Sequence, residues 1–575
     1  GTNAHTGTIA IGHNALTALT SGANLVAIGY QAGAALTSSG NSVFLGYQAG
    51  LEHTGANNIA IGDRAFYSTN AGSDSLASTK NVAIGNLALG GTFTDHQVDG
   101  TVALGYYALG NATMGGIDYN IAIGMESQLA NAGGQNVAIG YATLKVADGG
   151  ETGNVAIGTS SMDALNNDGA DYNIALGNYA LRGGTGLLAR NIAIGHQAMD
   201  GTATNNIAGT DNVFMGHSAG GGTWATAASN MNIGIGSLVL DAAMNGAEYN
   251  IGIGYAVLTE LTEGDNNVAI GGGAAYSITT GSDNIVLGRS AGDSITTGTN
   301  NVAIGKDSLG SLTIGQSNIA IGYQALLDAD LNEEFNIAIG TNAMENLNYN
   351  GSGNNIALGQ NAMQGGSISA AITDNIAIGQ YSLASITSAD EQIAIGKSAL
   401  YALTTGEKNT AIGFESLKTN ADGDFNTAVG YQALYTHDRS GTSNNTAVGH
   451  KAGYAVTDGY ESTLIGSNAG ASITTGFANT IIGANTADSL TTGDYNTAVG
   501  VHALSSEDVG RGTTAIGYQS LYSQNSDSND EVTGNTAVGM YSGYAVTTGN
   551  DNTLLGYEAG KAMTTNAKNV IIGFQ

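Results

Sequence analysis

Asn318-Ile319-Ala320-Ile321-Gly322 is the stretch that decides the fold, because close variants of it recur along the entire chain. Taking its Gly as position 0, 32 copies run from Gly12 to Gly573. Successive copies are most often separated by seventeen positions, in 15 of 31 cases, and the mean separation is only slightly larger. A short repeat of this kind indicates a solenoid in which each copy contributes one coil. A column denotes the residues at one position in all coils, numbered from this Gly.

The repeat length and composition predict strands. Seventeen residues are too few for a helix-turn-helix unit, and the β-branched residues and Thr-Thr-Gly turns favour extended chain. We expect two strands of about five residues and two turns in each coil, with very little helix. The predicted fold is therefore an all-β parallel β-solenoid of about 32 coils. At about 4.8 Å per coil it would span on the order of 150 Å.

No linker, charge block or change in composition marks a second domain. Residues 1–575 are predicted to form one continuous solenoid. Within it, residues 1–253 have uneven spacings, which predict irregular coils with loop insertions. Residues 254–575 keep mainly the 17-residue spacing and predict a regular shaft.

Two sets of columns are apolar. Position −1 is always aliphatic or Met, and position −3 is Ile, Val or Thr. Because alternate strand residues share a face, we assign −3 and −1, together with +3 and +7, to the core of the coil. Position −2 is Ala in 23 copies and +4 is most often Leu, so the other face is apolar as well. Such a stripe is too large to leave in water and predicts contact with sister chains. Its representative interface residues are Leu326, Leu400, Leu434, Leu464, Ile481 and Leu554.

The sizes of the residues in columns +4 and −2 are correlated. Eight coils carry Gly at +4, and in five of these the next coil has a bulky residue at −2. Compensation of volume indicates that the two columns share a space of fixed size. The pattern predicts that Gly453 lies against Leu464, and Gly470 against Ile481.

Three polar or aromatic columns have two interpretations each. Asn fills position −4 in 25 copies, and a stack of amides bonded to the turn backbone is favoured over a ligand-binding array. Thr fills position −3 from Thr410 to Thr553, which raises ice binding, but the core assignment of that column argues against it. Tyr often follows the motif Gly, as at Tyr30 and Tyr47, where stacking between coils is favoured over stacking on sugars.

Composition excludes several classes of protein. The 575 residues include 15 Lys and Arg against 46 Asp and Glu, a net charge of −31, which argues against nucleic acid or an anionic membrane as partner. With no Cys there is no disulfide or thiolate chemistry. No run of about 18 apolar residues exists, so we expect no membrane insertion. The sequence starts at Gly1 in the middle of the pattern, which suggests a processed or excised part of a longer chain.

Catalytic and metal-binding motifs are weak. The acidic pairs Glu333-Glu334 and Asp390-Glu391 are adjacent in sequence, so their side chains would point to opposite faces, a poor geometry for an acid and a base. We expect no enzymatic activity and no cofactor. The acidic loops at 163–171 and 527–531 could bind calcium weakly, although solvated loops are the simpler interpretation.

The motif resembles repeats of known fibres. Strings such as Asn136 to Gly140 are similar to the head repeats of trimeric autotransporter adhesins, although the adhesin repeat is usually shorter. The string from Asn426 to Leu434, Asn-Thr-Ala-Val-Gly-Tyr-Gln-Ala-Leu, is closer to repeats in phage tail fibres and related bacterial surface fibres. Those fibres often end in a peptidase S74-type chaperone. The resemblance implies a left-handed parallel β-roll with three chains around one axis.

These observations predict an extracellular structural and adhesive fibre, on a virion or a cell surface, such as a phage tail fibre. The alternatives are a bacterial trimeric adhesin head, a monomeric ice- or surface-binding solenoid and a glycan-cleaving spike. The expected partners are the chain itself, as a homotrimer, and a host cell-surface glycan or protein. Because binding residues concentrate in loops, receptor contact is expected in residues 63–230, with Trp224, Tyr67 and Phe93 as candidates.

Overall fold

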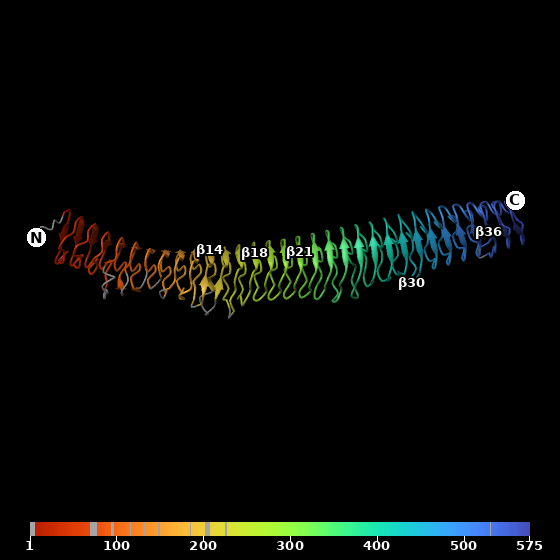
Figure 1. The fold of residues 1–575 in the computed structure, drawn as a ribbon. Helices are drawn as coiled ribbons and strands as arrows, with labels where there is room; N and C mark the ends of the chain where they lie inside the picture. The colour runs from red at the N-terminus through yellow and green to blue at the C-terminus, as the bar shows by residue number, and fades with distance from the viewer. Residues whose placement is uncertain are drawn as a thin grey trace. The chain divides into compact units, whose positions relative to one another are not determined.

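The computed structural model describes residues 6–68, 77–93, 97–114, 117–130, 133–147, 150–184, 186–201, 208–224, 227–528 and 531–574. It divides into two compact units, Gly1–Arg289 and Ser290–Gln575, shown along the chain in Figure 1. Both units are built from strands and turns, and the described residues contain no α-helix. The predicted all-β class is therefore confirmed.

Each unit contributes sixteen strands that coincide with copies of the motif. In the first unit these are β1 (Ile9–Ile11), β2 (Leu25–Ile28), β3 (Ser42–Leu45), β4 (Ile59–Ile61), β5 (Val82–Ile84), β7 (Val102–Leu104), β9 (Ile121–Ile123), β10 (Val137–Ile139), β11 (Val155–Ile157), β12 (Ile174–Leu176), β14 (Ile192–Ile194), β16 (Val213–Met215), β17 (Ile233–Ile235), β18 (Ile251–Ile253), β19 (Val268–Ile270) and β20 (Ile285–Leu287).

In the second unit they are β21 (Val302–Ile304), β22 (Ile319–Ile321), β23 (Ile337–Ile339), β24 (Ile356–Leu358), β25 (Ile376–Ile378), β26 (Ile393–Ile395), β27 (Thr410–Ile412), β29 (Thr427–Val429), β31 (Thr446–Val448), β32 (Thr463–Ile465), β33 (Thr480–Ile482), β34 (Thr497–Val499), β35 (Thr514–Ile516), β36 (Thr536–Val538), β37 (Thr553–Leu555) and β38 (Val570–Ile572). Shorter accessory pairs are β6 (Gly91–Phe93) with β8 (Ala112–Met114), β13 (Leu188–Ala189) with β15 (Gly209–Thr210), and β28 (Gly423–Asp424) with β30 (Gly441–Thr442).

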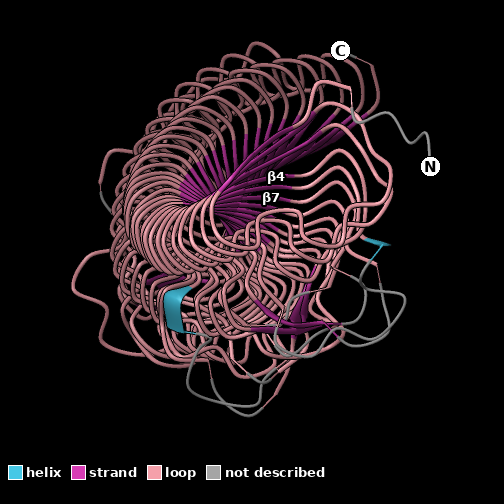
Figure 2. Cartoon of the chain, turned by 90° about the vertical axis from the view of Figure 1, so that its left-hand side faces the viewer, coloured by secondary structure: helices cyan, strands magenta, loops and turns pink. Residues whose placement is uncertain are grey.

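Motif strands pair in parallel with the copy one coil away, in motif register. Strand β22 pairs with β23 so that Ile319 faces Ile337 and Ala320 faces Ala338. Figure 2 looks along the coils and shows the strands stacked on one side, with loops forming the rest of each coil. This confirms the predicted parallel β-solenoid, and its regular coils have the predicted repeat length, as the pairing of Ile393 with Thr410 shows.

The expected second strand of each coil is wrong. A regular coil has one three-residue strand, and the rest of it is a series of turns. Residues at +2 and +4 adopt the left-handed conformation, as Gln324 (φ 53°) and Leu326 (φ 51°) show, and this breaks the extended chain. The turns still stack on the next coil, because the Leu326 N–H donates to the carbonyl of Ala343 at 2.9 Å.

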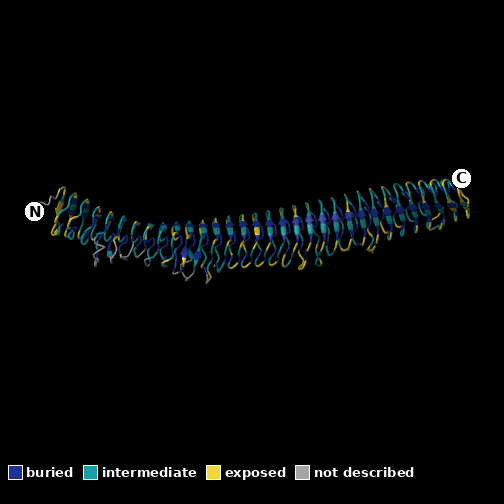
Figure 3. Ribbon diagram, viewed as in Figure 1, coloured by how far each residue is buried: buried dark blue, intermediate teal, exposed yellow. Residues whose placement is uncertain are grey.

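The faces of the strand are the reverse of the assignment made from the sequence. Ala320, at position −2, is fully buried inside the coil, as is Leu326 at +4. Side chains at −3 and −1 point outward and stay partly exposed. The reason is size, because where Leu at +4 already fills the short coil there is room only for Ala at the centre of the strand. The +3 and +7 columns are buried as assigned, for example at Ala325 and Leu403. Figure 3 shows the buried residues recurring coil after coil.

Two columns fix the coil spacing. The motif Gly322 has φ 139°, and a Cβ at this position would lie 2.5 Å from the carbonyl oxygen of Gly340, so neither the conformation nor the space admits a side chain. In the Asn column, the Oδ1 of Asn318 accepts a hydrogen bond from the N–H of Asn336 at 3.0 Å. The Nδ2 of Asn318 donates to the carbonyl of Glu333 at 2.7 Å. The structural interpretation of the Asn column is confirmed.

Candidate interaction surface

The outward face of the strands is a flat apolar surface. Strand after strand presents two side chains, at −3 and −1, that are at least partly exposed and mostly aliphatic. Ile270 in the first unit is 40% exposed and Ile339 in the second is 39% exposed. Because parallel pairing is in register, these side chains form two unbroken columns within each unit. We call this surface the strand face.

Aromatic residues flank the strand face on both sides. Tyr323, at +1, and Phe335, at −5, are 43% and 53% exposed. Rings in one column stack between coils, with centroids 5.3 Å apart for Tyr30 and Tyr47. The interpretation of the Tyr column as inter-coil stacking is confirmed for some coils, such as those of Tyr30, Tyr47 and Tyr431. Stacked rings hide their faces from each other and widen the apolar surface.

Part of the strand face carries hydroxyl groups. From Thr410 to Thr553, nine successive strands have Thr at −3 beside Ile, Val or Leu at −1. Thr463 and Thr480 are partly exposed, so this column lies on the outer surface rather than in the core. The argument that placed these Thr residues in the core is wrong for the same reason of size.

The residues predicted for the chain interface are all interior. Each is fully buried within its own coil, so none of them forms an outward stripe: Leu326, Leu400, Leu434, Leu464, Ile481 and Leu554. Sequence reasoning found an apolar surface but chose the wrong face. The available signal was the prevalence of Ala at −2, in 23 of 32 copies, since a column with little space favours the smallest side chain.

The volume compensation itself is real, but it operates inside the coil. A Cβ on Gly453 would lie 2.6 Å from Leu464 Cδ1, as the pattern predicted. Gly470 differs, because its nearest atoms belong to Ile473 and to Leu464 of its own coil, not to Ile481. A glycine at +4 therefore makes room for a large residue at −2 of either its own coil or the next.

Of the residues predicted for receptor contact, Trp224 lies in the interior rather than on an exposed loop. Trp224 is fully buried, and its Nε1 donates to the carbonyl of Gly220 at 3.1 Å, so its ring is folded back onto its own coil. Tyr67 is half-buried. The side chain of Phe93 lies outside the described residues, although its backbone is part of β6.

The adjacent pair Glu333 and Glu334 diverges, as predicted. Glu333 is fully buried, and burial raises the pKa of its carboxyl to about 7, with a smaller contribution from the charge of Asp330. Its Oε2 accepts the N–H of Leu331 at 3.1 Å, whereas Oε1 has no hydrogen-bond partner among the described residues. Glu334 is partly exposed and accepts Gln316 Nε2 at 3.1 Å. The two carboxyl groups therefore lie in different environments, one interior and one at the surface.

No group of three or more His, Asp or Glu side chains capable of holding a metal occurs in the described ranges. In the acidic loop at 163–171, Asp163 accepts a hydrogen bond from Arg182 at 3.4 Å. The other acidic loop, 527–531, lies partly outside the described residues. Calcium binding there stays a prediction. The same described ranges contain no helix long and apolar enough to cross a bilayer. Comparison of the chain with protein-family models and with curated proteins finds no match.

Proposed function

We propose that the chain is a structural and adhesive fibre of a virion or a cell surface, assembled from three copies and acting through reach and attachment rather than catalysis. The observation that carries this proposal is the strand face, an apolar surface that repeats on every coil of both units. Surfaces of this extent on a soluble protein are normally covered by a partner. The resemblance to trimeric fibre repeats favours other copies of the chain as that partner.

The energetics favour self-association of the strand face. Away from the first and last coils, each Ile or Val of the two columns has already buried more than half of its surface, and covering the rest would contribute about 1 kcal/mol per side chain. Many such rungs act together, because the register within each unit is fixed by the coil spacing. Copies of one solenoid share this spacing, so their rungs match without distortion.

The mass of the chain in solution tests the proposal. Light scattering should give three times the chain mass of 57.5 kDa. Ile321→Asp together with Ile339→Asp should yield monomers with an unchanged far-UV circular dichroism spectrum, because these side chains point outward and a charge there opposes only assembly. Leu327→Asp is the matched control, an apolar and partly buried residue on the turn side of the same coil, and should keep the parental mass.

A second candidate function, ice or surface binding by a monomer, is favoured by the outward Thr column. A flat array of Thr and aliphatic side chains exposed to water would then be the functional surface. Both candidate functions use the strand face. They exclude each other, because this face is covered by other copies of the chain in the first and exposed to water in the second. A parental mass of one chain, together with inhibition of ice recrystallisation that is lost in Thr463→Tyr, would favour the second. A trimeric parent without such inhibition would favour the first.

A further inference from the structure

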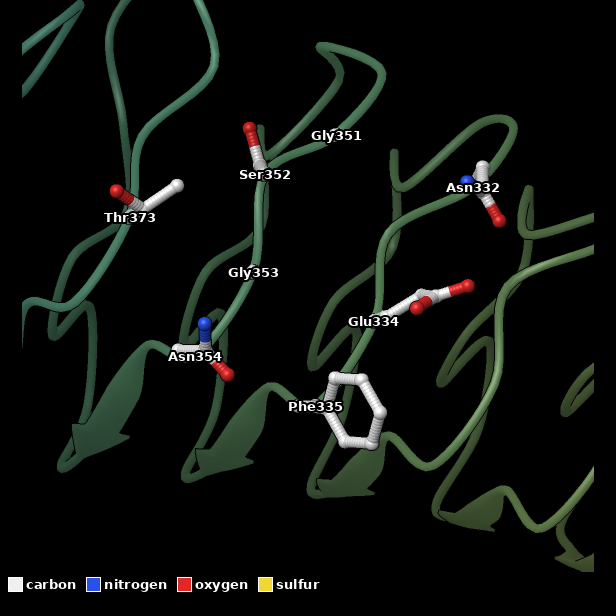
Figure 4. A pocket seen from close by; sticks show the side chains of 8 residues that line it. All are labelled: Asn332, Glu334, Phe335, Gly351, Ser352, Gly353, Asn354 and Thr373. Carbon is white, nitrogen blue, oxygen red and sulfur yellow. The ribbon is translucent and has the colours of Figure 1, made fainter.

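A hollow interrupts the surface of the second unit next to the strand face. It spans three coils, has a volume of about 230 Å³ and is lined by Glu334, Phe335, Ser352, Gly353, Asn354 and Thr373, among others. Figure 4 shows that the lining residues lie on neighbouring coils. A volume of this size corresponds to roughly eight waters at about 30 Å³ each, enough for one six-membered sugar ring.

The hollow exists because the column at −6 lacks a side chain at Gly353. In two later coils the side chain in this column accepts the backbone N–H of the preceding coil: Asp390 accepts Thr373 N at 2.6 Å, and Asp424 accepts Glu407 N at 2.9 Å. At Gly353 the preceding Glu334 N–H instead contacts the carbonyl of Ser352 at 3.4 Å. A Cβ on Gly353 would lie 2.7 Å from the Glu334 carbonyl, so a side chain at this position is disfavoured and the space stays open.

The groups around the hollow are both polar and apolar. Glu334 Oε1 is held by Gln316, and the other carboxylate oxygen has no hydrogen bond to any described residue. Asn354 is exposed, with its backbone fixed by a bond from its N–H to the Glu334 carbonyl at 3.2 Å. Phe335 is 53% exposed beside them. A carboxylate, an amide and an open aromatic ring together match a ligand with hydroxyl groups on its rim and an apolar face.

We propose that this hollow binds a neutral pyranose unit of a host surface glycan, a site that rests on the proposed attachment function and gives it a location. The C–H face of the sugar packs on Phe335, and its hydroxyls pair with Glu334 and Asn354. Acidic sugars are excluded, because Glu334 and the net charge of −31 repel a carboxylate. The site lies outside residues 63–230, where the long loops had predicted receptor contact.

Saturation-transfer NMR on the intact chain tests the site, with methyl glucopyranoside, methyl galactopyranoside and glucuronate as probes. The parent should show transfer to at least one neutral glycoside and none to glucuronate. Phe335→Ala and Glu334→Ala should each weaken binding about tenfold. Phe425→Ala and Glu407→Ala are the matched controls at the same repeat positions, −5 and −6, and should bind like the parent. Phe425 lies beside Lys408, whose Nζ is 5.6 Å from the ring centroid.

The experiment tests the sugar site separately from the proposed fibre assembly. The mass of every variant is measured in parallel, so that a failure of assembly is distinguished from a failure of sugar binding. A trimeric parent that binds no neutral glycoside, or that binds glucuronate equally well, would overturn the sugar site and leave the fibre intact. Undiminished binding by Phe335→Ala would overturn it as well.

Discussion

A histidine buried inside one coil shows that the core of the coil disfavours a charged side chain. His437 occupies the +7 column, where Leu403 and Ile473 stand in other coils, and is fully buried. Neither ring nitrogen has a hydrogen-bond partner in the part of the chain that the structure describes. Burial lowers the pKa of His437 to about 4 from the ordinary 6.5, with a further lowering by the charge of Arg439. The ring is therefore buried in its neutral form.

This burial makes the local stability depend on pH. The folded coil resists protonation of His437, whereas the unfolded chain takes up the proton near pH 6.5, so the unfolded state binds more protons below that pH. The contribution is fully present above pH 6.5 and is lost progressively as pH falls toward 4, by about 3 kcal/mol in all. Native-state hydrogen exchange of the His437 amide, which donates to the Leu434 carbonyl, measures this loss.

His437→Leu should remove that pH dependence and stabilise the coil by about 1–3 kcal/mol at pH 7, because Leu matches the rest of the column. His450→Gln is the control, since His450 is exposed and stacks on Tyr431 at 5.3 Å. It should leave the pH dependence of the His437 amide unchanged. An equally steep loss of protection in His437→Leu would show that another group titrates.

At the level of the coil, the repeat correctly predicted the stacking of parallel coils. The assignment of the inward and outward faces of the strand was wrong. The period, the Asn column and the motif Gly each followed from residue chemistry, because hydrogen bonding and close approach restrict residue type directly. The inward and outward faces could not be separated in this way, because both are apolar. The left-handed Leu at +4, as in Leu400 (φ 49°), also leaves no mark in composition, since Leu is uncommon in that conformation.

The packing inside the coil predicts strong coupling between Gly453 and Leu464. Gly453→Leu should overpack the coil by about 1–3 kcal/mol, because its side chain would occupy the space of Leu464. The left-handed backbone adds a cost of about 1 kcal/mol, which Leu434 already bears at the same position (φ 48°). Adding Leu464→Ala should relieve much of the overpacking cost, whereas the backbone cost should remain.

Hydrogen exchange of the Val456 amide, which donates to the Gly453 carbonyl at 3.1 Å, measures the local stability of the parent, the two single variants and the double variant of this cycle. Strictly additive effects would contradict the contact. Gly441→Leu offers a control for the backbone term, because Gly441 has φ 75° and no atom within 4 Å of a built Cβ.

On the scale of the whole molecule, the proposed function depends on which surface the copies of the chain bury against one another. A chain with one apolar face and a net charge of −31 meets two opposing forces when copies associate. Burial of the strand face favours assembly and is insensitive to moderate salt. Repulsion between acidic chains opposes assembly and acts over the Debye length, about 30 Å at 0.01 M salt and about 10 Å at 0.1 M.

Assembly should therefore strengthen as salt is added, the opposite of an interface made from ion pairs. The ion pairs within the described chain contribute little to this balance where they are exposed to solvent, as in Arg190 with Asp211 at 2.7 Å. Sedimentation velocity over a dilution series at 0.01 M and 0.15 M sodium chloride measures the effect. The trimer should persist to lower concentration at 0.15 M. Dissociation at the higher salt would mean that charge pairs between chains, rather than the strand face, hold the assembly together.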